Sequence, residues 1–329
     1  MAVSPKIIKR RIRSVSNTKK ITKAMELVSA AKMRKAVART LASRAYAGTA
    51  WELVQRLTMR VDYQHPLLGN KQDESTYSSS DSDDASEESR SSRQARTVNK
   101  TAVIVISSNR GLCGSFNARI AGEALKMKDV EYITMGRKSR DIIRRNGATI
   151  AADFEKKDIT TSIADLSPLT RLVMDGFLDG TYSRVSVVYM DFISSLVQQS
   201  RVKQLLPFIA EEDENLGVIG TSPRNLTPTL SSEEREKLTK RGEYEYLIEP
   251  APDVVLNDLL PRLVELQLYQ SVLESEASEH SARMLAMRNA TDAAGDMMQE
   301  LTLMYNQARQ AGITREIAEI AGGKAALEN

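Results

Sequence analysis

Side chains suited to chemistry are few in this chain, which has one cysteine and two histidines. Cys113 lies in a short glycine-containing loop, Ser107–Gly114, ahead of a predicted helix. A helix N-terminus lowers the pKa of a thiol, so Cys113 could act as a nucleophile. We favour the alternative of a small buried residue in a tight turn. His65 and His280 are far apart in the sequence and are expected on helical or loop surfaces, which disfavours a histidine metal site or a Ser-His-Asp triad.

The loop follows a predicted buried strand, Ala102–Ile106, and precedes a predicted helix from Ser115 onward. Such a unit resembles the first turn of a nucleotide-binding α/β fold. Its glycines form a single G-x-x-G, without the dinucleotide fingerprint or a Walker lysine-serine pair. We therefore expect no bound dinucleotide, no other cofactor and no metal, and we expect the glycines to serve a sharp turn. The chain shows no complete active site, and the sequence predicts a protein that is not itself catalytic.

The loop belongs to a predicted central α/β domain, residues 101–250. Further strands are predicted at Val130–Met135, Arg184–Asp191, Val202–Phe208 and Glu243–Ile248, and helices at Arg137–Asn146 and Pro168–Leu178. Strands that alternate with helices indicate an open, mostly parallel, Rossmann-like sheet.

Both ends of the chain are long stretches without proline, from Pro5 to Pro66 and from Pro261 to Asn329. Apolar residues recur there at mostly three- and four-residue steps, which predicts helices. In the first stretch they are Ile8, Ile12, Val15, Ile21, Met25 and Val28. Toward the end they are Leu256, Leu259, Leu260, Leu263, Leu266, Val272 and Leu273, followed by Met284, Met287, Met297, Leu301 and Met304. Because both helices join the same central domain, we predict a long antiparallel coiled coil of residues 1–66 and 251–329.

The two ends carry opposite charge. Residues 1–60 hold fifteen Lys or Arg and two acids, a net of +13, and residues 271–329 hold nine acids and five Lys or Arg, a net of −4. Opposite signs favour pairing of the two helices, although an exposed ion pair contributes only about 0–1 kcal/mol. A basic helix also suits an acidic partner or a polyanion.

Three other features bound the class of protein. Residues 67–100 contain a run rich in serine and acids, nine serines and seven acids between Lys71 and Val98, which predicts a disordered insertion or a phosphorylated regulatory loop. No apolar run approaches the roughly 20 residues needed to span a bilayer. The start is basic and free of acids up to Glu26, so it could mimic a mitochondrial transit peptide, but we expect it to be mature structure.

Three motifs carry a resemblance to a known family, in the right order and over nearly the whole chain. Ile12–Val28 (IRSVSNTKKITKAMELV), followed by Lys32–Lys35, strongly resembles the N-terminal helix of the gamma subunit of F-type ATP synthase. Asn109–Asn117 (NRGLCGSFN) resembles that family's central loop. Ser275–Thr291 and Asn306–Ile317 resemble its C-terminal helix. The match begins near residue 6, which leaves little room for a transit peptide and favours a bacterial protein.

The resemblance implies a rotor shaft of a rotary motor. The terminal helices would be the axle inside a ring of alpha and beta subunits, and the α/β domain would touch the epsilon subunit and the membrane c-ring. Proton flow would turn the shaft, and ATP chemistry would take place on the beta subunits. The chain would be peripheral to the cell membrane, on its cytoplasmic side, with no bound nucleic acid.

By the same resemblance, six residues would contact partners. Arg309, Gln310 and Thr314 would hydrogen-bond loops of the ring, and Met25 with Lys20 and Lys23 would face an acidic lever on a beta subunit. For the lysines, a solvated helix face is the alternative. The last residues, 317–326, would be the tip of the axle in an apolar bearing. The insertion at 71–98 departs from the family pattern.

Two rival functions follow from the residues alone. One is a basic coiled coil that binds nucleic acid, since Lys and Arg neutralise phosphates. Residues 1–60 contain few aromatic residues, Tyr46 and Trp51, and no recognisable nucleic-acid-binding module. The other rival is a small α/β enzyme that uses the loop around Cys113.

Overall fold

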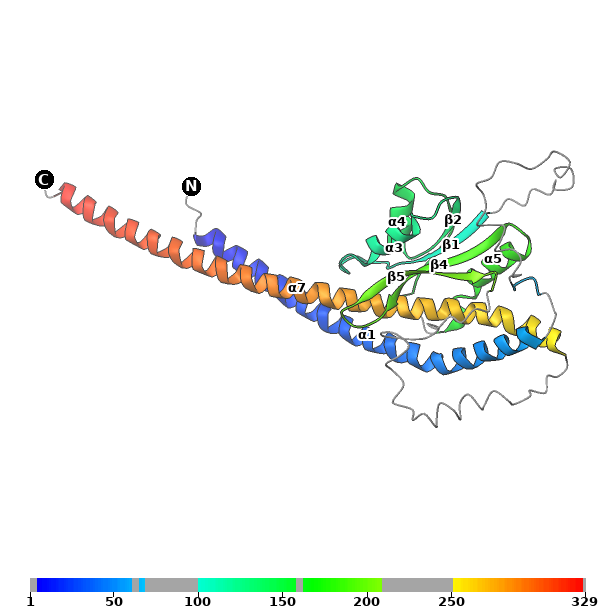
Figure 1. Ribbon diagram of the computed structural model, residues 1–329. Coiled ribbons are helices and arrows are strands. Elements are labelled where there is room, and N and C mark those ends of the chain that lie inside the picture. The colour runs from blue at the N-terminus through cyan, green and yellow to red at the C-terminus, as the bar shows by residue number, and fades with distance from the viewer. Residues whose placement is uncertain (1–4, 61–64, 69–99, 158–161, 209–250, 328–329) are drawn as a thin grey trace, which may run out of the picture. The chain divides into compact units, whose positions relative to one another are not determined.

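A computed structural model describes residues 5–60, 65–68, 100–157, 162–208 and 251–327 of this chain (Figure 1). Its elements, in chain order, are α1 (Pro5–Arg60), β1 (Lys100–Ile106), α3 (Phe116–Ala124), β2 (Val130–Met135), α4 (Arg137–Arg145), β3 (Ile150–Phe154), η2 (Ile163–Asp165), α5 (Ser167–Leu178), β4 (Tyr182–Phe192), β5 (Gln198–Leu206) and α7 (Pro252–Leu327). The predicted class, two long terminal helices with an α/β domain between them, is confirmed.

The five strands form one sheet in the order β3-β2-β1-β4-β5. The pairs β1 with β2, β1 with β4 and β2 with β3 are parallel, and β4 with β5 is antiparallel. The prediction of an open, mostly parallel sheet is therefore correct. Strand β2 has the predicted bounds, and β1 and β4 each extend the predicted range at one or both ends.

Strand β1 lies at the centre of the sheet and explains how the domain is layered. Successive side chains of a strand point to opposite faces. Ala102, Ile104 and Ile106 belong to a core shared with α5 and α7, whereas Val103 and Val105 belong to a core shared with α3 and α4. Both faces are thus covered, as a near-continuous apolar run such as β1 requires.

The edge strands were the harder ones to predict. Strand β3, Ile150–Phe154, was missed because it is short and alternates between exposed and half-buried residues. Strand β5 was predicted as Val202–Phe208 and is Gln198–Leu206. Its polar first half is held by backbone pairing with β4, not by burial of apolar side chains. The predicted strand Glu243–Ile248 lies outside the described residues.

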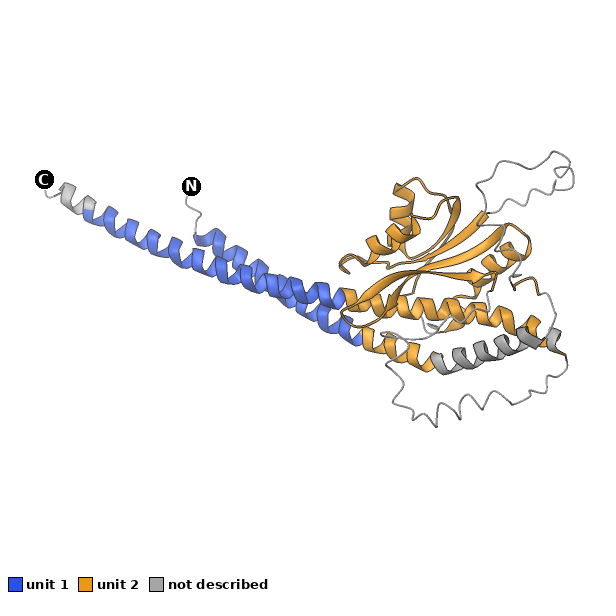
Figure 2. Ribbon diagram, in the orientation of Figure 1, with its two compact units in different colours: residues 1–31, 283–329 blue, residues 32–282 orange. Residues whose placement is uncertain are grey.

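The chain divides into two compact units (Figure 2). The first comprises residues 1–31 and 283–329, and the second comprises residues 32–282. Helices α1 and α7 contribute to both. The predicted domain boundaries at 66, 100 and 250 lie next to segments outside the described residues and stay predictions, as does the nature of the 67–100 insertion.

Helix α7 begins before the proline-free stretch. Pro252 is its first residue, a position that suits proline because the missing N–H has no partner there anyway. Pro261 lies inside the helix and removes one backbone hydrogen bond. Apolar residues on either side of it, Leu260 and Leu263, are buried in the core. Among the described residues, no helix combines the length and the apolar character needed to cross a membrane.

Candidate functional site

The first unit is a pair of helical segments that run antiparallel. The hydroxyl oxygens of Thr22 and Thr291 are 2.8 Å apart. The Lys19 ammonium lies 3.0 Å from where a Cβ on Gly295 would be. Residue numbers therefore fall along α1 as they rise along α7. The predicted antiparallel pairing is confirmed within this unit.

The contact between the two segments follows a coiled-coil repeat. On α1 the buried or half-buried positions recur every seven residues, at Ile8, Val15, Thr22 and Ser29. On α7 they recur at alternating steps of four and three residues, at Met287, Thr291, Ala294, Met298 and Leu301. A repeat of 3.5 residues keeps the buried stripe facing the partner helix along a left-handed supercoil.

This repeat corrects part of the predicted apolar stripe. Ile21 and Val28 were assigned to the buried face but are 60% and 56% exposed. Thr22 and Ser29, one residue later in each case, occupy the contact instead. Thr22 is tolerated there because its hydroxyl meets that of Thr291 and the backbone carbonyl of Lys19. Met297 and Met304 on α7 are likewise exposed and not in the contact.

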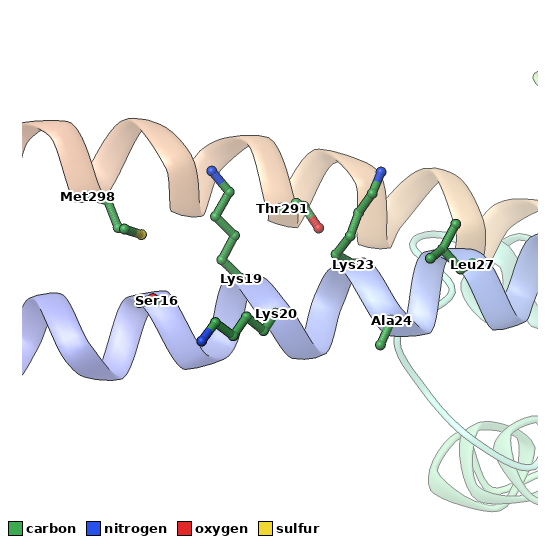
Figure 3. Close-up of a pocket in the computed structure, with 8 residues that line it drawn as sticks. All are labelled: Ser16, Lys19, Lys20, Lys23, Ala24, Leu27, Thr291 and Met298. Atoms are coloured by element: carbon green, nitrogen blue, oxygen red, sulfur yellow. The ribbon is translucent and has the colours of Figure 1, made fainter.

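A basic groove runs along the pair, with a volume of about 620 Å³. Its lining residues are Ser16, Lys19, Lys20, Lys23, Ala24, Leu27, Thr291 and Met298. Figure 3 shows Lys19 and Lys23 extending toward α7 and Lys20 pointing away from it. Lys23 donates to Glu26 of its own helix at 3.0 Å. The lining combines lysines with the apolar side chains of Ala24, Leu27 and Met298, which suits an acidic partner that also carries apolar groups.

Charge pairing does not hold the two segments together in the way the opposite net charges suggested. Among the described side chains, Asp292, Asp296 and Glu300 of α7 form no ion pair with any cation. Lys19 and Lys20 of α1 likewise form none with any described acid. These five charges therefore do not contribute ion pairs to the pairing, whereas packing of the repeat does contribute to it.

The six predicted partner-contact residues all lie in this unit. Lys20 and Lys23 are exposed and Met25 is half-buried. Arg309, Gln310 and Thr314 are exposed on α7, where the Thr314 hydroxyl donates to the Gln310 carbonyl at 3.0 Å. The structure thus divides the six into two groups on different helices. Their contacts with partners stay predictions.

The loop after β1 is a tight turn built from its own side chains. Asn117 of α3 accepts hydrogen bonds from the backbone N–H and the hydroxyl of Ser108, at 3.1 and 2.9 Å. The Asn117 amide donates to the Cys113 sulfur at 3.1 Å. Cys113 is buried, and Gly114 has a left-handed φ of 58°. This is the small buried residue in a sharp turn that we favoured over a nucleophile.

Sequence reasoning missed a buried polar stretch of α7. All sixteen residues from 266 to 281 are buried, and Glu274, Ser278, Glu279 and Ser281 are among them. Burial, with a smaller contribution from the nearby Asp191, raises the pKa of Glu274 to about 8, against the opposing effects of Lys203, the Tyr189 hydrogen bond and Arg201. The signal in the sequence was the cluster of Ser, Glu and His residues inside a long helix.

Both histidines are buried, so their predicted surface positions are wrong. His280 lies within the buried stretch of α7. The His65 Nδ1 accepts the backbone N–H of Leu67 at 3.0 Å, and its Nε2 lies 2.9 Å from Asn257 Oδ1. With one nitrogen accepting and the other donating, His65 is the neutral tautomer. Burial lowers the pKa of His65, and the bond with Asn257 partly offsets this.

Comparisons with known proteins cover nearly the whole chain. A family model described as ATP synthase matches residues 4–327. The ATP synthase gamma chain of Legionella pneumophila (strain Corby) is 33% identical over 331 residues, which cover 98% of this chain and 99% of the relative. That of Heliobacterium modesticaldum is 38% identical over 325 residues, covering 97% and 98%.

Solved structures show the same fold. A chain in the structure of Euglena gracilis mitochondrial ATP synthase that comprises OSCP, F1 and c-ring aligns with a TM-score of 0.61 at 20% identity. The alignment covers 98% of this chain and 94% of that one.

Proposed function

Because the chain belongs to the ATP synthase family and matches its gamma chains end to end, we propose that it is the central shaft of an F-type ATP synthase. It couples proton-driven rotation of a membrane ring to conformational cycling of the catalytic beta subunits. One observation carries this proposal: the full-length similarity to gamma chains extends over both segments of the antiparallel helix pair.

The shaft acts by making different contacts with each of the subunits that surround it. A ligand shifts a conformational equilibrium only by as much as its affinity differs between the states. An asymmetric shaft presents a different face to each of three otherwise equal subunits, so each is biased toward a different conformation. The helix pair is asymmetric in this sense, with the groove lysines on α1 and the acids Asp292, Asp296 and Glu300 on α7.

The surface of the first unit supports a surrounding partner. Large apolar side chains that the repeat leaves outside the contact are exposed on it, among them Ile21, Leu27, Val28, Leu303 and Ile317. Exposed apolar patches mark interaction sites. A ring that encloses the helix pair would cover them.

Specific contacts are proposed from the family resemblance. Lys20 and Lys23, together with the half-buried Met25, face an acidic lever on a beta subunit. Arg309, Gln310 and Thr314 hydrogen-bond loops of the ring that grip the axle. The chain is non-catalytic, and it is peripheral to the cell membrane on its cytoplasmic side, held there through alpha, beta and epsilon subunits and the c-ring.

The nucleic-acid alternative gains nothing from the relatives described above, all of which are ATP synthase chains. The basic helix is accounted for by an acidic protein partner.

The first experiment is to tag the chain in its own cell, solubilise the membranes gently and identify what is recovered with it. We expect alpha, beta and epsilon subunits and ATPase activity. Recovery of nucleic acid, or of the chain alone without ATPase activity, contradicts the shaft assignment.

The contact at Met25 is tested separately with Met25→Lys in membrane vesicles. We expect fewer protons pumped per ATP hydrolysed, because a further cation disturbs the face that meets the acidic lever. An unchanged ratio, with unchanged subunit content, means that Met25 does not lie at that contact.

A further inference from the structure

The buried polar stretch of α7 ends where the second unit ends. Glu274, Ser278, Glu279 and Ser281 occupy its last two turns, and the division between the units falls directly after Ala282. Helix α7 runs on without interruption to Leu327. Any force that passes along α7 out of the second unit therefore passes through these two turns.

Each of the four side chains contacts the α/β domain through a polar group. The Ser278 hydroxyl donates to the Met190 carbonyl of β4 at 3.1 Å. The Ser281 hydroxyl donates to the Ser195 carbonyl, in the turn between β4 and β5, at 2.6 Å. Glu274 is hydrogen-bonded with Tyr189 of β4.

The fourth contact is a buried ion pair. The ammonium of Lys156, two residues after the end of β3, donates to Glu279 Oε2 at 2.6 Å, and the two side chains are 3% and 11% exposed. The backbone carbonyl of Lys156 accepts the Asn109 amide at 2.5 Å, and Asn109 Oδ1 accepts the backbone N–H of Arg137 at 3.3 Å. Lys156 is thus braced by the loop after β1 and by the start of α4.

The contacts act on two sides of the helix. At 3.6 residues per turn, Ser278 and Ser281 lie within about 40° of Glu274 around the axis, whereas Glu279 lies about 140° away. The first three grip β4 and the β4–β5 turn, and Glu279 is held by Lys156. A rotation of α7 about its axis in either direction must break contacts on one side.

Polar and apolar contacts differ in how they resist such a rotation. Burial of apolar surface is non-directional, so an apolar helix face can shift by repacking. Hydrogen bonds weaken steeply when their angles depart from linear, and a buried ion pair that is separated leaves two desolvated charges. The apolar part of α7, from Leu256 to Leu273, stabilises the core, whereas the polar turns fix the angle of the helix.

We propose that the polar turns Glu274–Ser281, with Lys156, form the torsional joint through which torque passes between the α/β domain and the helix pair. This joint names positioning residues for the proposed shaft function and rests on it. The residues contact no nucleotide and do not act on ATP. They hold α7 at a fixed angle to the α/β domain, so that the helix turns with that domain.

The test uses the assembled ATP synthase with Lys156→Met and Glu279→Met combined. This change replaces both buried charges with apolar groups of similar length, a replacement that is commonly neutral for stability. A bead is fixed to Lys126→Cys, an exposed site in the α/β domain. It reports the angular fluctuation of that domain while the ring of alpha and beta subunits is held still. The variance of the angle varies inversely with the stiffness of the joint.

We expect the variance to rise at least twofold, with subunit content and ATP hydrolysis retained. Proton pumping per ATP should fall when vesicles pump against a proton gradient. The reversed pair, Lys156→Glu with Glu279→Lys, should recover part of the stiffness. The matched control is Lys157→Met with Asp165→Asn, which removes an adjacent pair whose lysine is 62% exposed and should leave the variance unchanged.

Other outcomes contradict the joint. An unchanged variance in an assembled complex overturns it, even if the melting temperature falls. If the double variant does not assemble, Ser278→Ala and Ser281→Ala replace it, since each removes one hydroxyl in favour of the best helix former. An unchanged variance in both serine variants then overturns the proposal. A wild-type chain that never copurifies with ATPase contradicts the shaft assignment itself, so the two failures are distinct.

Discussion

The two parts of helix α7 lie in very different environments. In the second unit every residue from 266 to 281 is buried, including glutamates, serines and a histidine. In the first unit only every third or fourth residue faces α1, and leucines and isoleucines lie on the outside. The usual distribution of polar and apolar residues is thus partly reversed in each unit: α7 buries polar groups in the second unit and exposes large apolar groups in the first.

The inversion shows what each unit is built to do. Buried polar groups need partners, and they find them in fixed geometry on the sheet. Exposed apolar groups need a partner that the described residues of the chain do not supply. The second unit therefore fixes α7 in position, and the first unit exposes α7 for contact with a partner.

The largest expected difference comes from the same substitution at two places in α7. Leu273→Ala removes a fully buried side chain from the core, whereas Leu303→Ala changes one that is 64% exposed. We expect Leu273→Ala to lower the free energy of unfolding by about 2–5 kcal/mol and Leu303→Ala to change it by less than about 0.5 kcal/mol.

Urea unfolding of the purified chain measures both values. Equal losses at the two positions would mean that the isolated chain buries Leu303 as well, and the contrast between the units would disappear.

The second prediction concerns the buried carboxyl. Glu274 has a pKa of about 8 in the folded chain and 4.5 as its ordinary value. Between these values the unfolded chain is ionised at this position while the folded chain keeps the proton, so stability is lost as pH rises through that window. Asp191, Tyr189, Arg201 and Lys203 face this carboxyl.

Glu274→Gln cannot ionise and should flatten this dependence, by up to about 1.4 kcal/mol per pH unit. Unfolding at pH 5, 6.5 and 8 compares the slopes of wild type and variant. Parallel slopes would show that Glu274 is ionised in the folded chain, and its place in the buried stretch would need revision.

A third contrast uses two helical glycines, one in each unit. A Cβ on Gly176 of α5 would lie 2.7 Å from the ring of Tyr182, a buried core residue. A Cβ on Gly295 would meet only the flexible end of Lys19, at 3.0 Å. We expect Gly176→Ala to destabilise by about 1–3 kcal/mol and Gly295→Ala to stabilise by up to about 1 kcal/mol.

Thermal unfolding of the two variants shows whether each alanine raises or lowers the stability of the chain. The contrast is broken if both alanines stabilise, because Tyr182 would then have room to move aside.

The smallest effect should come from the Thr22–Thr291 contact. Thr22→Ala, Thr291→Ala and the double variant form a cycle, and we expect a coupling of about 0.5–1.5 kcal/mol. Thr302, an exposed α7 threonine bonded only to its own helix, provides the control partner for Thr22. A coupling near zero would assign the register to apolar packing alone.

Sequence patterns were sufficient where burial is regular. Strand β2, Val130–Met135, is buried on both faces from Tyr132 onward, and its bounds could be predicted from the sequence. The coiled-coil stripe was misplaced by one residue at two positions, because Thr22 and Ser29 are polar and Ile21 and Val28 are not. Small hydroxyl residues can bond their own helix carbonyls, and hydropathy does not register this.

The joint could not have been predicted by periodicity. Lys156 and Glu279 are 123 positions apart, and each reads as a solvated surface residue. Only the fold brings them together and removes the water around them. The six partner-contact residues came from family resemblance and not from physics of the isolated chain, because their partners are other chains.

The pairing of Thr22 with Thr291 spans 269 positions, and this has a consequence for synthesis on the ribosome. At roughly 5–20 residues per second, about 13–54 s separate the appearance of the two threonines. During that interval the first helix has no α7 segment to cover its contact stripe. Completion of the nascent chain, and not the local folding of α1, therefore sets when the axle forms.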